Sequence, residues 1–269
     1  MFSTLRGIIS DNWAWRGQVW RLAITELQKQ VRGAVLGWIW LFATPLIYIG
    51  VFWFALEIGL KKNSPVDGIP FVVWLSCGLI PWFFMNSMIT TGANVYRRYS
   101  YLVNRLRFPI SVISTFYTMA QFITFLLSMI IVGAVMAMYR IKPTLYAIQV
   151  PFVAVIMMVF WTTWSMMMSP LSALSKDLFN LIKAMSMPLF WLSGTIFRIS
   201  TIENPAIRWV LAFNPISFFV TSFRASLCED FWIWEDHRLF YPFLGVFVLL
   251  IIGAIRVQSR LSTEVCDVL

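Results

Sequence analysis

The sequence contains little charge. Only 12% of its 269 residues are Asp, Glu, Lys or Arg, about half the share of an ordinary soluble domain, and 59% are hydrophobic. This excludes a soluble globular protein and predicts an all-α membrane protein with several spans. The 14 tryptophans and 24 phenylalanines fit a protein whose solvent is lipid and whose helix ends lie among headgroups.

Residues and motifs of known catalytic sites are also scarce. The three cysteines, Cys77, Cys228 and Cys266, have no metal-ligand spacing, and the single histidine is His237. No HExxH, CxxC, G-x-S-x-G or phosphate-binding G-x-x-x-x-G-K-[ST] motif is present. We therefore expect no catalytic residue, metal site or bound cofactor in this chain.

The acidic loop before the last apolar segment is the exception that we considered. Glu229, Asp230, Glu235 and Asp236 are the carboxylates that an outward-facing membrane transferase would need. A solvated loop explains the same residues, with His237 as a surface side chain, and we favour that interpretation.

Long apolar runs predict six membrane-spanning helices with both termini on the inner side. The ranges are 34–56, 71–93, 109–138, 145–168, 178–196 and 239–255. Pro170 is expected to close the fourth span, and Pro188 to interrupt the short fifth one. The inner loops hold more Lys and Arg than the outer loops, as the positive-inside rule requires, so the net charge of +9 gives no reason to expect nucleic acid. The chain thus divides into a cytoplasmic N-terminus (1–33), a membrane domain (34–257) and a cytoplasmic tail (258–269).

The segment before the first span has the pattern of a helix that lies in the membrane interface. Its apolar stripe consists of Trp20, Ala23, Ile24, Leu27 and Val31, and its polar face of Arg21, Thr25, Gln28 and Arg32. A plain extension of the first span is the alternative.

A basic segment, residues 94–109, joins the second and third spans. Its apolar residues recur at helical spacing and leave four arginines on the other faces: Val95, Tyr99, Leu102 and Leu106 against Arg97, Arg98, Arg105 and Arg107. The pattern predicts one amphipathic helix over 94–108 on the inner surface. Either it only fixes the topology, or a cytoplasmic partner grips it as a lever; both interpretations stay open at this point.

Two Asn-Pro pairs predict two short helices after the fifth span. Asn204-Pro205 and Asn214-Pro215 are helix-start signals, giving helices over 205–213 and 215–227. At about 14 and 20 Å they are too short to cross a hydrocarbon core of about 30 Å. They either dip into the membrane and return, or form a hairpin on its surface.

Lys183 is a cation within a predicted span. It would either meet an anionic headgroup that enters from the inner leaflet, together with Arg21 and Arg32, or extend its ammonium group back to water.

Taken in order, the motifs resemble those of ABC exporter permeases for cell-surface polysaccharides. They are ELQKQ (26–30), GAVLGWIW (33–40), TPL (44–46), GLIPWFF (78–84), NRLRFP (104–109), SALSKD (172–177), FNPI (213–216) and Phe223-Arg224, with a similar tail over 260–267. The resemblance covers nearly the whole chain. At 193–198 this sequence reads SGTIFR where many members have Ser-Pro and Tyr-Pro, which affects the expected shape of the outer gate.

The resemblance implies a homodimer in the bacterial cytoplasmic (inner) membrane, each half served by a separate ATPase subunit that binds ATP and Mg. The basic segment would be the coupling helix that docks on this subunit, through Tyr96, Arg97, Arg98, Tyr101, Asn104 and Arg105. The helices 205–213 and 215–227 would be gate helices at the outer mouth. The cargo would be a glycan on a polyprenyl pyrophosphate lipid, such as O-antigen, capsule or teichoic acid; the alternative is a small amphipathic drug or lipid.

Aromatic side chains then become candidates for a channel wall on which sugar rings stack. The set is Trp82, Phe83, Phe190, Trp191, Phe197, Trp209, Phe213 and Phe218. Each of them equally fits an aromatic residue that packs between helices or faces lipid.

Overall fold

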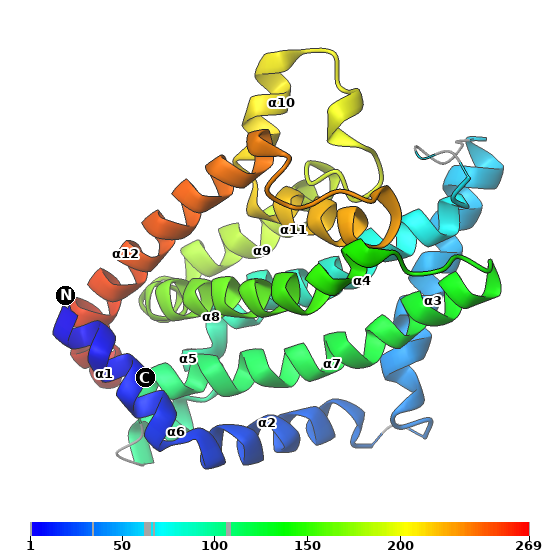
Figure 1. The fold of residues 1–269 in the computed structure, drawn as a ribbon. Helices are drawn as coiled ribbons and strands as arrows, with labels where there is room; N and C mark the ends of the chain where they lie inside the picture. The colour runs from blue at the N-terminus through cyan, green and yellow to red at the C-terminus, as the bar shows by residue number, and fades with distance from the viewer. Residues whose placement is uncertain (1, 34, 62–65, 67, 106–108, 269) are drawn as a thin grey trace.

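The computed structural model describes residues 2–33, 35–61, 66, 68–105 and 109–268, and every regular element in this part of the chain is helical (Figure 1). The α-helices are α1 Phe2–Ala14, α2 Arg16–Val31, α3 Ile39–Trp53, α4 Phe71–Thr90, α5 Val95–Arg98, α6 Ser100–Arg105, α7 Ile110–Met138, α8 Val150–Leu174, α9 Lys176–Trp191, α10 Pro205–Ala212, α11 Pro215–Arg224 and α12 His237–Val268. Short 3-10 turns are η2 Gly92–Asn94, η3 Leu145–Gln149 and η4 Ile199–Thr201, and π-helical turns are η1 Phe54–Gly59 and η5 Ala225–Glu229.

The prediction of an all-α polytopic membrane protein is confirmed. In the described part of the chain, five helical stretches are long and apolar enough to cross a membrane: Ile39–Gly59, Phe71–Leu102, Ile110–Met138, Leu145–Leu174 and His237–Leu261. A sixth is counted if α10 and α11 with η5, which are bent by 93°, form one broken span. The predicted fifth span differs, because α9 has 16 residues and a length of about 24 Å.

Proline does not end helices where the sequence analysis expects it to. α8 continues past Pro170 to Leu174, and α9 contains Pro188. The proline at 170 removes the N–H that would bond the carbonyl of Met166. The amide of Gln258 supplies a donor in its place, with Nε2 2.8 Å from that carbonyl oxygen, so the freed carbonyl keeps a hydrogen bond.

Helix α4 forms the centre of the bundle. In its most apolar stretch 78% of the residues are buried, against 17 to 33% in the other four spans. α3, α7, α8, α9 and α11 all pack against it. A helix that is apolar on every side is stable only when other helices surround it, which is what the pattern of burial shows.

α2 is amphipathic, as predicted, but its stripe is rotated by about one residue. Val19, Ala23, Leu27 and Val31 are buried, whereas Trp20 is 54% exposed. The buried residues are spaced by four and pack against α7, which leaves Trp20 outside the contact. Trp20 of the predicted apolar stripe thus lies outside this helix contact, and the prediction that α2 lies in the membrane interface stays a prediction.

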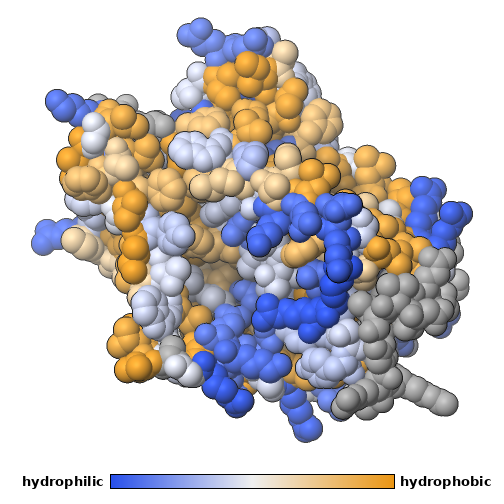
Figure 2. All heavy atoms as spheres, turned by 180° about the vertical axis from the view of Figure 1, so that it is seen from behind, coloured by the Kyte–Doolittle hydropathy of each residue, from blue (hydrophilic) through white to orange (hydrophobic). Residues whose placement is uncertain are grey.

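The surface of the molecule has a more hydrophilic side and a more hydrophobic side. Seen from behind, hydrophilic atoms gather towards the lower middle and right, on the side of α2 and of the chain termini, and the upper left is mostly hydrophobic (Figure 2). α1, the end of α12 and the α5–α6 segment lie at one end of the molecule (Figure 1).

Candidate functional site

The basic segment is helical but broken. α5 ends at Arg98 and α6 begins at Ser100, so the single helix predicted over 94–108 is wrong; residues 106–108 lie outside the described part of the chain. Tyr99 leaves the helical conformation, with φ −114° and ψ 30°, and its ring packs on Phe116 at 5.0 Å. The predicted apolar face is confirmed for Val95, Tyr99 and Leu102, which are all buried.

Neutral hydrogen bonds fix this segment to the bundle. The Tyr96 amide donates to Ser169 Oγ at 2.8 Å, and the Tyr96 hydroxyl accepts from Gln258 Nε2 at 2.7 Å. Ser165 Oγ donates to the Gly92 carbonyl at 2.7 Å. The segment is therefore attached to α8 and, through Gln258, to α12.

Two of the predicted coupling arginines bind within the chain. Arg97 Nη2 donates to the Ala173 carbonyl at 2.6 Å. Arg98 Nη2 forms an ion pair with Glu26 at 3.1 Å, and the Glu26 side chain, on α2, is only 2% exposed. The segment is thereby joined to the last turn of α8 and to α2.

The other predicted coupling residues divide between interior and surface. Tyr96 is 1% exposed, so any part it has in coupling is indirect. Tyr101 is 49% exposed, on α6. Asn104 and Arg105 form the last residues of that helix. Among the side chains that the structure describes here, a partner can therefore reach Tyr101 and the outer side of Arg98.

The predicted channel aromatics also fall into two groups. Trp82, Phe190 and Phe218 are buried and pack on rings: Trp82 on Phe190 at 5.1 Å, and Phe218 on Phe243 at 3.9 Å. Phe83 is half-buried and meets the ring of Tyr48 at 5.4 Å. The members that remain accessible are Trp191, Trp209 and Phe213, at 49, 53 and 56% exposure, and the half-buried Phe197.

The three cations proposed for headgroup binding are all exposed but are not gathered. Arg21 lies on α2 and Arg32 follows it, whereas Lys183 lies on α9. α2 packs against α7, while α9 packs against α4 and α8. The described residues thus provide no single site that holds all three.

The two Asn-Pro helices form as predicted. Asn204 Oδ1 accepts from the Ala206 amide at 2.9 Å, and Asn214 Oδ1 accepts from the Ile216 amide at 3.1 Å, so each asparagine caps its helix. α10 ends at Ala212, one residue early, and α11 passes into the π turn η5 at Ala225.

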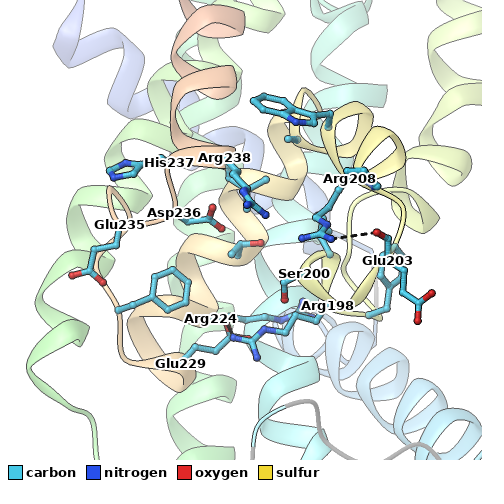
Figure 3. A pocket seen from close by; sticks show the side chains of 18 of the residues that line it. Arg198, Ser200, Glu203, Arg208, Arg224, Glu229, Glu235, Asp236, His237 and Arg238 are labelled. Carbon is cyan, nitrogen blue, oxygen red and sulfur yellow. Dashed lines mark hydrogen bonds and ion pairs between the residues drawn. The ribbon is translucent and has the colours of Figure 1, made fainter.

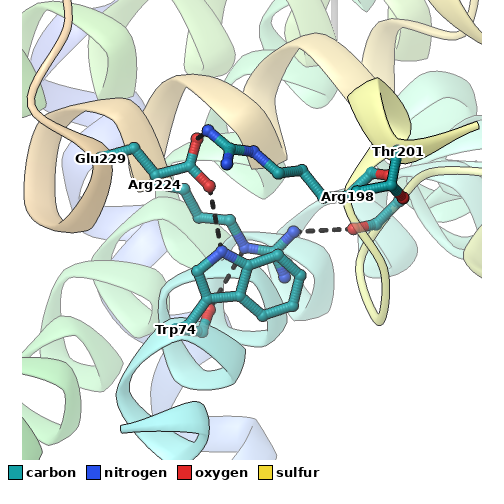
Figure 4. A network of polar contacts seen from close by, with 6 residues as sticks. Trp74, Arg198, Thr201, Arg224 and Glu229 are labelled. Carbon is teal, nitrogen blue, oxygen red and sulfur yellow. Dashed lines mark hydrogen bonds and ion pairs between the residues drawn. The ribbon is translucent and has the colours of Figure 1, made fainter. Parts of the chain in front are cut away.

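A buried arginine ties α11 to its surroundings (Figure 4). Arg224 is 3% exposed, and its Cζ lies 3.3 Å from the centre of the Trp74 ring. Nε donates to the Trp74 carbonyl at 3.2 Å and Nη1 to the Gly194 carbonyl at 2.7 Å, while Nη2 donates to the Thr195 carbonyl. One side chain thus joins α11, α4 and the turn after α9.

Glu229 completes this network. Its carboxylate accepts from Trp74 Nε1 and from Arg198 Nη2, both at 3.0 Å, and only 4% of its side chain is exposed. The expectation of a solvated loop is wrong for Glu229, because its two donors replace the water that burial removes. A carboxylate held in this way is also not free to act as a base for a transferase.

Gly78 on α4 is needed for the approach of Arg224. A Cβ at this position would lie 2.8 Å from Arg224 Cζ, closer than van der Waals contact. Only glycine lets the guanidinium group reach the three carbonyls.

Sequence reasoning missed the residues that hold these contacts. Glu26 could have been noticed, because it is an acid on the buried side of α2, and Arg224 because it ends an apolar, aromatic helix. Gln258, Trp74 and the contact of Cys77 with Cys228, whose Sγ atoms are 3.4 Å apart, had no sequence signal.

A cavity of about 940 Å³ opens beside the Arg224 network (Figure 3). Its walls come from the 197–203 segment, α10, α11, the 229–236 segment and the start of α12. Among the predicted channel residues, Phe197 and Trp209 line it. The geometry therefore defines two regions: the basic segment at one end of α12 and this cavity at the other.

Known proteins show a match over most of the chain. The family model described as "ABC-2 type transporter" matches residues 17–228. An O-antigen export system permease protein RfbA of Myxococcus xanthus is 24% identical over 233 residues, which cover 86% of this chain and 85% of the relative. Two proteins of the same name from Klebsiella pneumoniae are each 21% identical over 245 residues, covering 91% of this chain and 92% of theirs.

Proposed function

The chain belongs to the ABC-2 type transporter family, and from this premise we propose that it is the membrane subunit of an ATP-driven exporter of a cell-surface polysaccharide. The cargo is a glycan of the O-antigen, capsule or teichoic acid type, carried on a polyprenyl pyrophosphate lipid. The observation that carries the proposal is the similarity to three O-antigen export permeases over 85 to 92% of their lengths.

Family membership implies a partner ATPase subunit, which in our proposal binds ATP and Mg. In this arrangement two copies of the permease and two ATPases form the exporter in the bacterial cytoplasmic membrane, with both termini in the cytoplasm. The chain itself carries out no chemical step.

The contacts of the basic segment support a lever. Tyr101 and Arg105 on α6 contact the ATPase. The movement of the ATPase is transmitted to the bundle by the ion pair of Arg98 and the hydrogen bonds of Tyr96. Arg98 moves α2 through Glu26, and Tyr96 moves α8 and α12 through Ser169 and Gln258. Because the bonds of Tyr96 are short and buried, and Arg98 meets a buried carboxylate, movement of the segment is passed to the helices to which it is attached.

α12 extends this path to the cavity. Gln258, next to Tyr96, and Leu239, in the cavity wall, are 19 residues apart on one helix, or about 28 Å. A displacement at the cytoplasmic end can therefore reach the outer end along one continuous helix, which contains Pro242 near its outer end. Trp191, Trp209 and Phe213 are the aromatics accessible to the glycan, while the buried Trp82, Phe190 and Phe218 keep the helices in place.

Depletion of this chain in cells tests the proposed cargo. We expect a lipid-linked glycan to accumulate on the inner leaflet and the surface glycan to disappear. Accumulation of a small amphipathic compound, with normal surface glycan, would instead indicate an exporter of drugs or lipids.

A paired substitution tests the lever. Tyr101→Glu with Arg105→Glu places two negative charges on α6, and should abolish co-purification of the ATPase and export while the permease stays folded. The matched control is Tyr139→Glu with Arg140→Glu, an exposed Tyr-Arg pair at the other end of α7, which should leave both unchanged. Unimpaired pairing and export in the first variant would contradict this part of the proposal.

A further inference from the structure

The cavity beside Arg224 contains hydrogen-bond donors without a partner among the residues that the structure describes. Arg208 Nε is buried without a hydrogen-bond partner, and Arg208 Nη2 reaches the Glu203 carbonyl only at 3.5 Å, the limit for a hydrogen bond. Arg238 has no hydrogen bond or ion pair to any described residue and is exposed. Both side chains point into the cavity from different walls (Figure 3). A buried donor without a partner calls for an explanation, and a ligand supplies one.

The remaining charges of the cavity are largely accounted for. Glu229 pairs with Arg198, and Arg224 donates to three backbone carbonyls. Asp236 points into the cavity between the walls (Figure 3), and Glu235, which also lines it, accepts a hydrogen bond from the Trp232 amide at 3.2 Å. Over the whole lining, four arginines (Arg198, Arg208, Arg224 and Arg238) are balanced by four carboxylates (Glu203, Glu229, Glu235 and Asp236), so the cavity carries no excess of formal charge. What favours an anion is local: Arg208 Nε and the Arg238 guanidinium group have no partner among the described residues and point into the cavity (Figure 3).

Aromatic side chains line the same space. Trp209 is 53% exposed, and Phe197 and Phe231 are half-buried in the wall. The flat, partly apolar face of a sugar ring stacks on such side chains, while its hydroxyl groups are bonded by charged side chains around it. A planar guanidinium group binds carboxylate or phosphate with two parallel hydrogen bonds.

We propose that this cavity binds a saccharide unit bearing a carboxylate or phosphate group, with Arg208 and Arg238 on the anion, Asp236 on hydroxyl groups and Trp209 against the ring. The proposal rests on the function proposed above and deepens it: the exported glycan carries acidic residues, which this outer site holds as they pass. The volume of about 940 Å³ accommodates more than one sugar ring.

Binding to the purified full-length permease in nanodiscs tests the proposal. The probes are digalacturonic acid, glucose 1-phosphate, the neutral disaccharide maltose and inorganic phosphate, and tryptophan fluorescence reports the occupancy. We expect at least one of the two acidic sugars to bind with a dissociation constant of about 1 mM or tighter. Maltose and inorganic phosphate should each bind at least about tenfold more weakly, because maltose lacks the anionic group and phosphate lacks the sugar ring.

Substitutions locate the binding. Arg208→Gln and Arg238→Gln should each weaken binding of the acidic sugar by at least about tenfold, the loss of one charge-assisted bond, and Arg208→Lys by less. Arg140→Gln, an exposed arginine outside the cavity wall, is the matched control and should bind normally. Thermal unfolding of each variant establishes that it is folded.

The results distinguish a carboxylate ligand from a phosphate ligand, and a failure of this inference from a failure of the proposed function. Binding of digalacturonic acid alone assigns a carboxylate, and of glucose 1-phosphate alone a phosphate; either supports the proposal. Equal binding of maltose, equal binding of inorganic phosphate, unchanged binding in both arginine variants, or no binding by either acidic sugar would overturn it. If depletion removes the surface glycan while no acidic sugar binds, only this inference fails; if the surface glycan persists after depletion, the proposed function fails.

Discussion

The two ends of α12 use polar residues in opposite ways. At the basic segment the buried contacts are mostly neutral hydrogen bonds, as in Tyr96 with Gln258 and Ser165 with Gly92, while the side chains of Tyr101 and Arg98 are about half exposed. At the cavity the charges face inwards, and Arg224 is fully buried beneath them. The first arrangement suits rigid attachment with a surface for a protein partner, and the second suits the binding of a polar ligand inside the molecule.

The energetic consequences differ as well. A neutral buried hydrogen bond contributes about 1 kcal/mol to stability, whereas a buried arginine requires full compensation by acceptors. We therefore expect substitutions near the cavity to affect stability most and those near the basic segment to affect coupling most. Three substitutions test this comparison, in order of decreasing expected effect.

Arg224→Leu should destabilise the fold by about 3 to 5 kcal/mol, because the carbonyls of Trp74, Gly194 and Thr195 lose their donor inside the protein. Thermal unfolding in detergent and the yield of monodisperse protein measure the loss. The control is Arg256→Leu, an exposed arginine on α12, which should unfold at the wild-type temperature. Gly78→Ala displaces the same guanidinium group and should also destabilise the fold. If the Arg224→Leu protein is as stable as the wild type, the cavity end of α12 is not the end on which stability depends most.

Glu26→Arg should destabilise the attachment of α2 by about 2 kcal/mol, because it places a cation beside Arg98 and Lys29. The exchanged pair, Glu26→Arg with Arg98→Glu, restores opposite charges and should recover most of the loss. Unfolding temperatures of the wild type, both single variants and the exchanged pair form the double-mutant cycle. Additive effects in the cycle would show that this ion pair does not hold α2 to the basic segment.

Gln258→Leu should have the smallest effect on stability, about 1 to 2 kcal/mol, since it removes the hydrogen bonds that Gln258 donates to the Tyr96 hydroxyl and to the Met166 carbonyl. Its expected effect is on coupling: ATP hydrolysis by the assembled exporter continues while glycan export falls. Ser259→Ala, the exposed neighbour, serves as control. If ATP hydrolysis and glycan export fall together, the hydrogen bond between Gln258 and Tyr96 does not transmit movement.

Short-range patterns predicted a large part of the fold. The span over 109–138 agrees with α7 to within one residue, and both Asn-Pro pairs begin helices. Hydrophobic periodicity also identified the buried face of Val95, Tyr99 and Leu102. These features depend on residues within a few positions of one another, so a single sequence contains the information.

Boundaries that depend on distant partners were predicted less well. α8 passes Pro170 because Gln258, far along the chain, supplies a donor to Met166. The basic segment breaks at Tyr99, whose ring packs on Phe116 of the following span. Neither partner is visible in the local pattern, since proline alone predicts an end and regular spacing alone predicts one helix.

The sequence by itself determined that this is a helical membrane protein, where most of its helices begin, and that a basic segment separates two spans. Only the tertiary structure decided which charges are buried and paired: Arg98 meets Glu26 across 72 residues, and Arg224 meets Trp74 across 150. The physical reason is the distance along the chain over which each kind of interaction acts. Hydrophobic periodicity and helix caps act over one or two turns, whereas a buried ion pair or stacked guanidinium group exists only once the packing of several helices has excluded water from both partners.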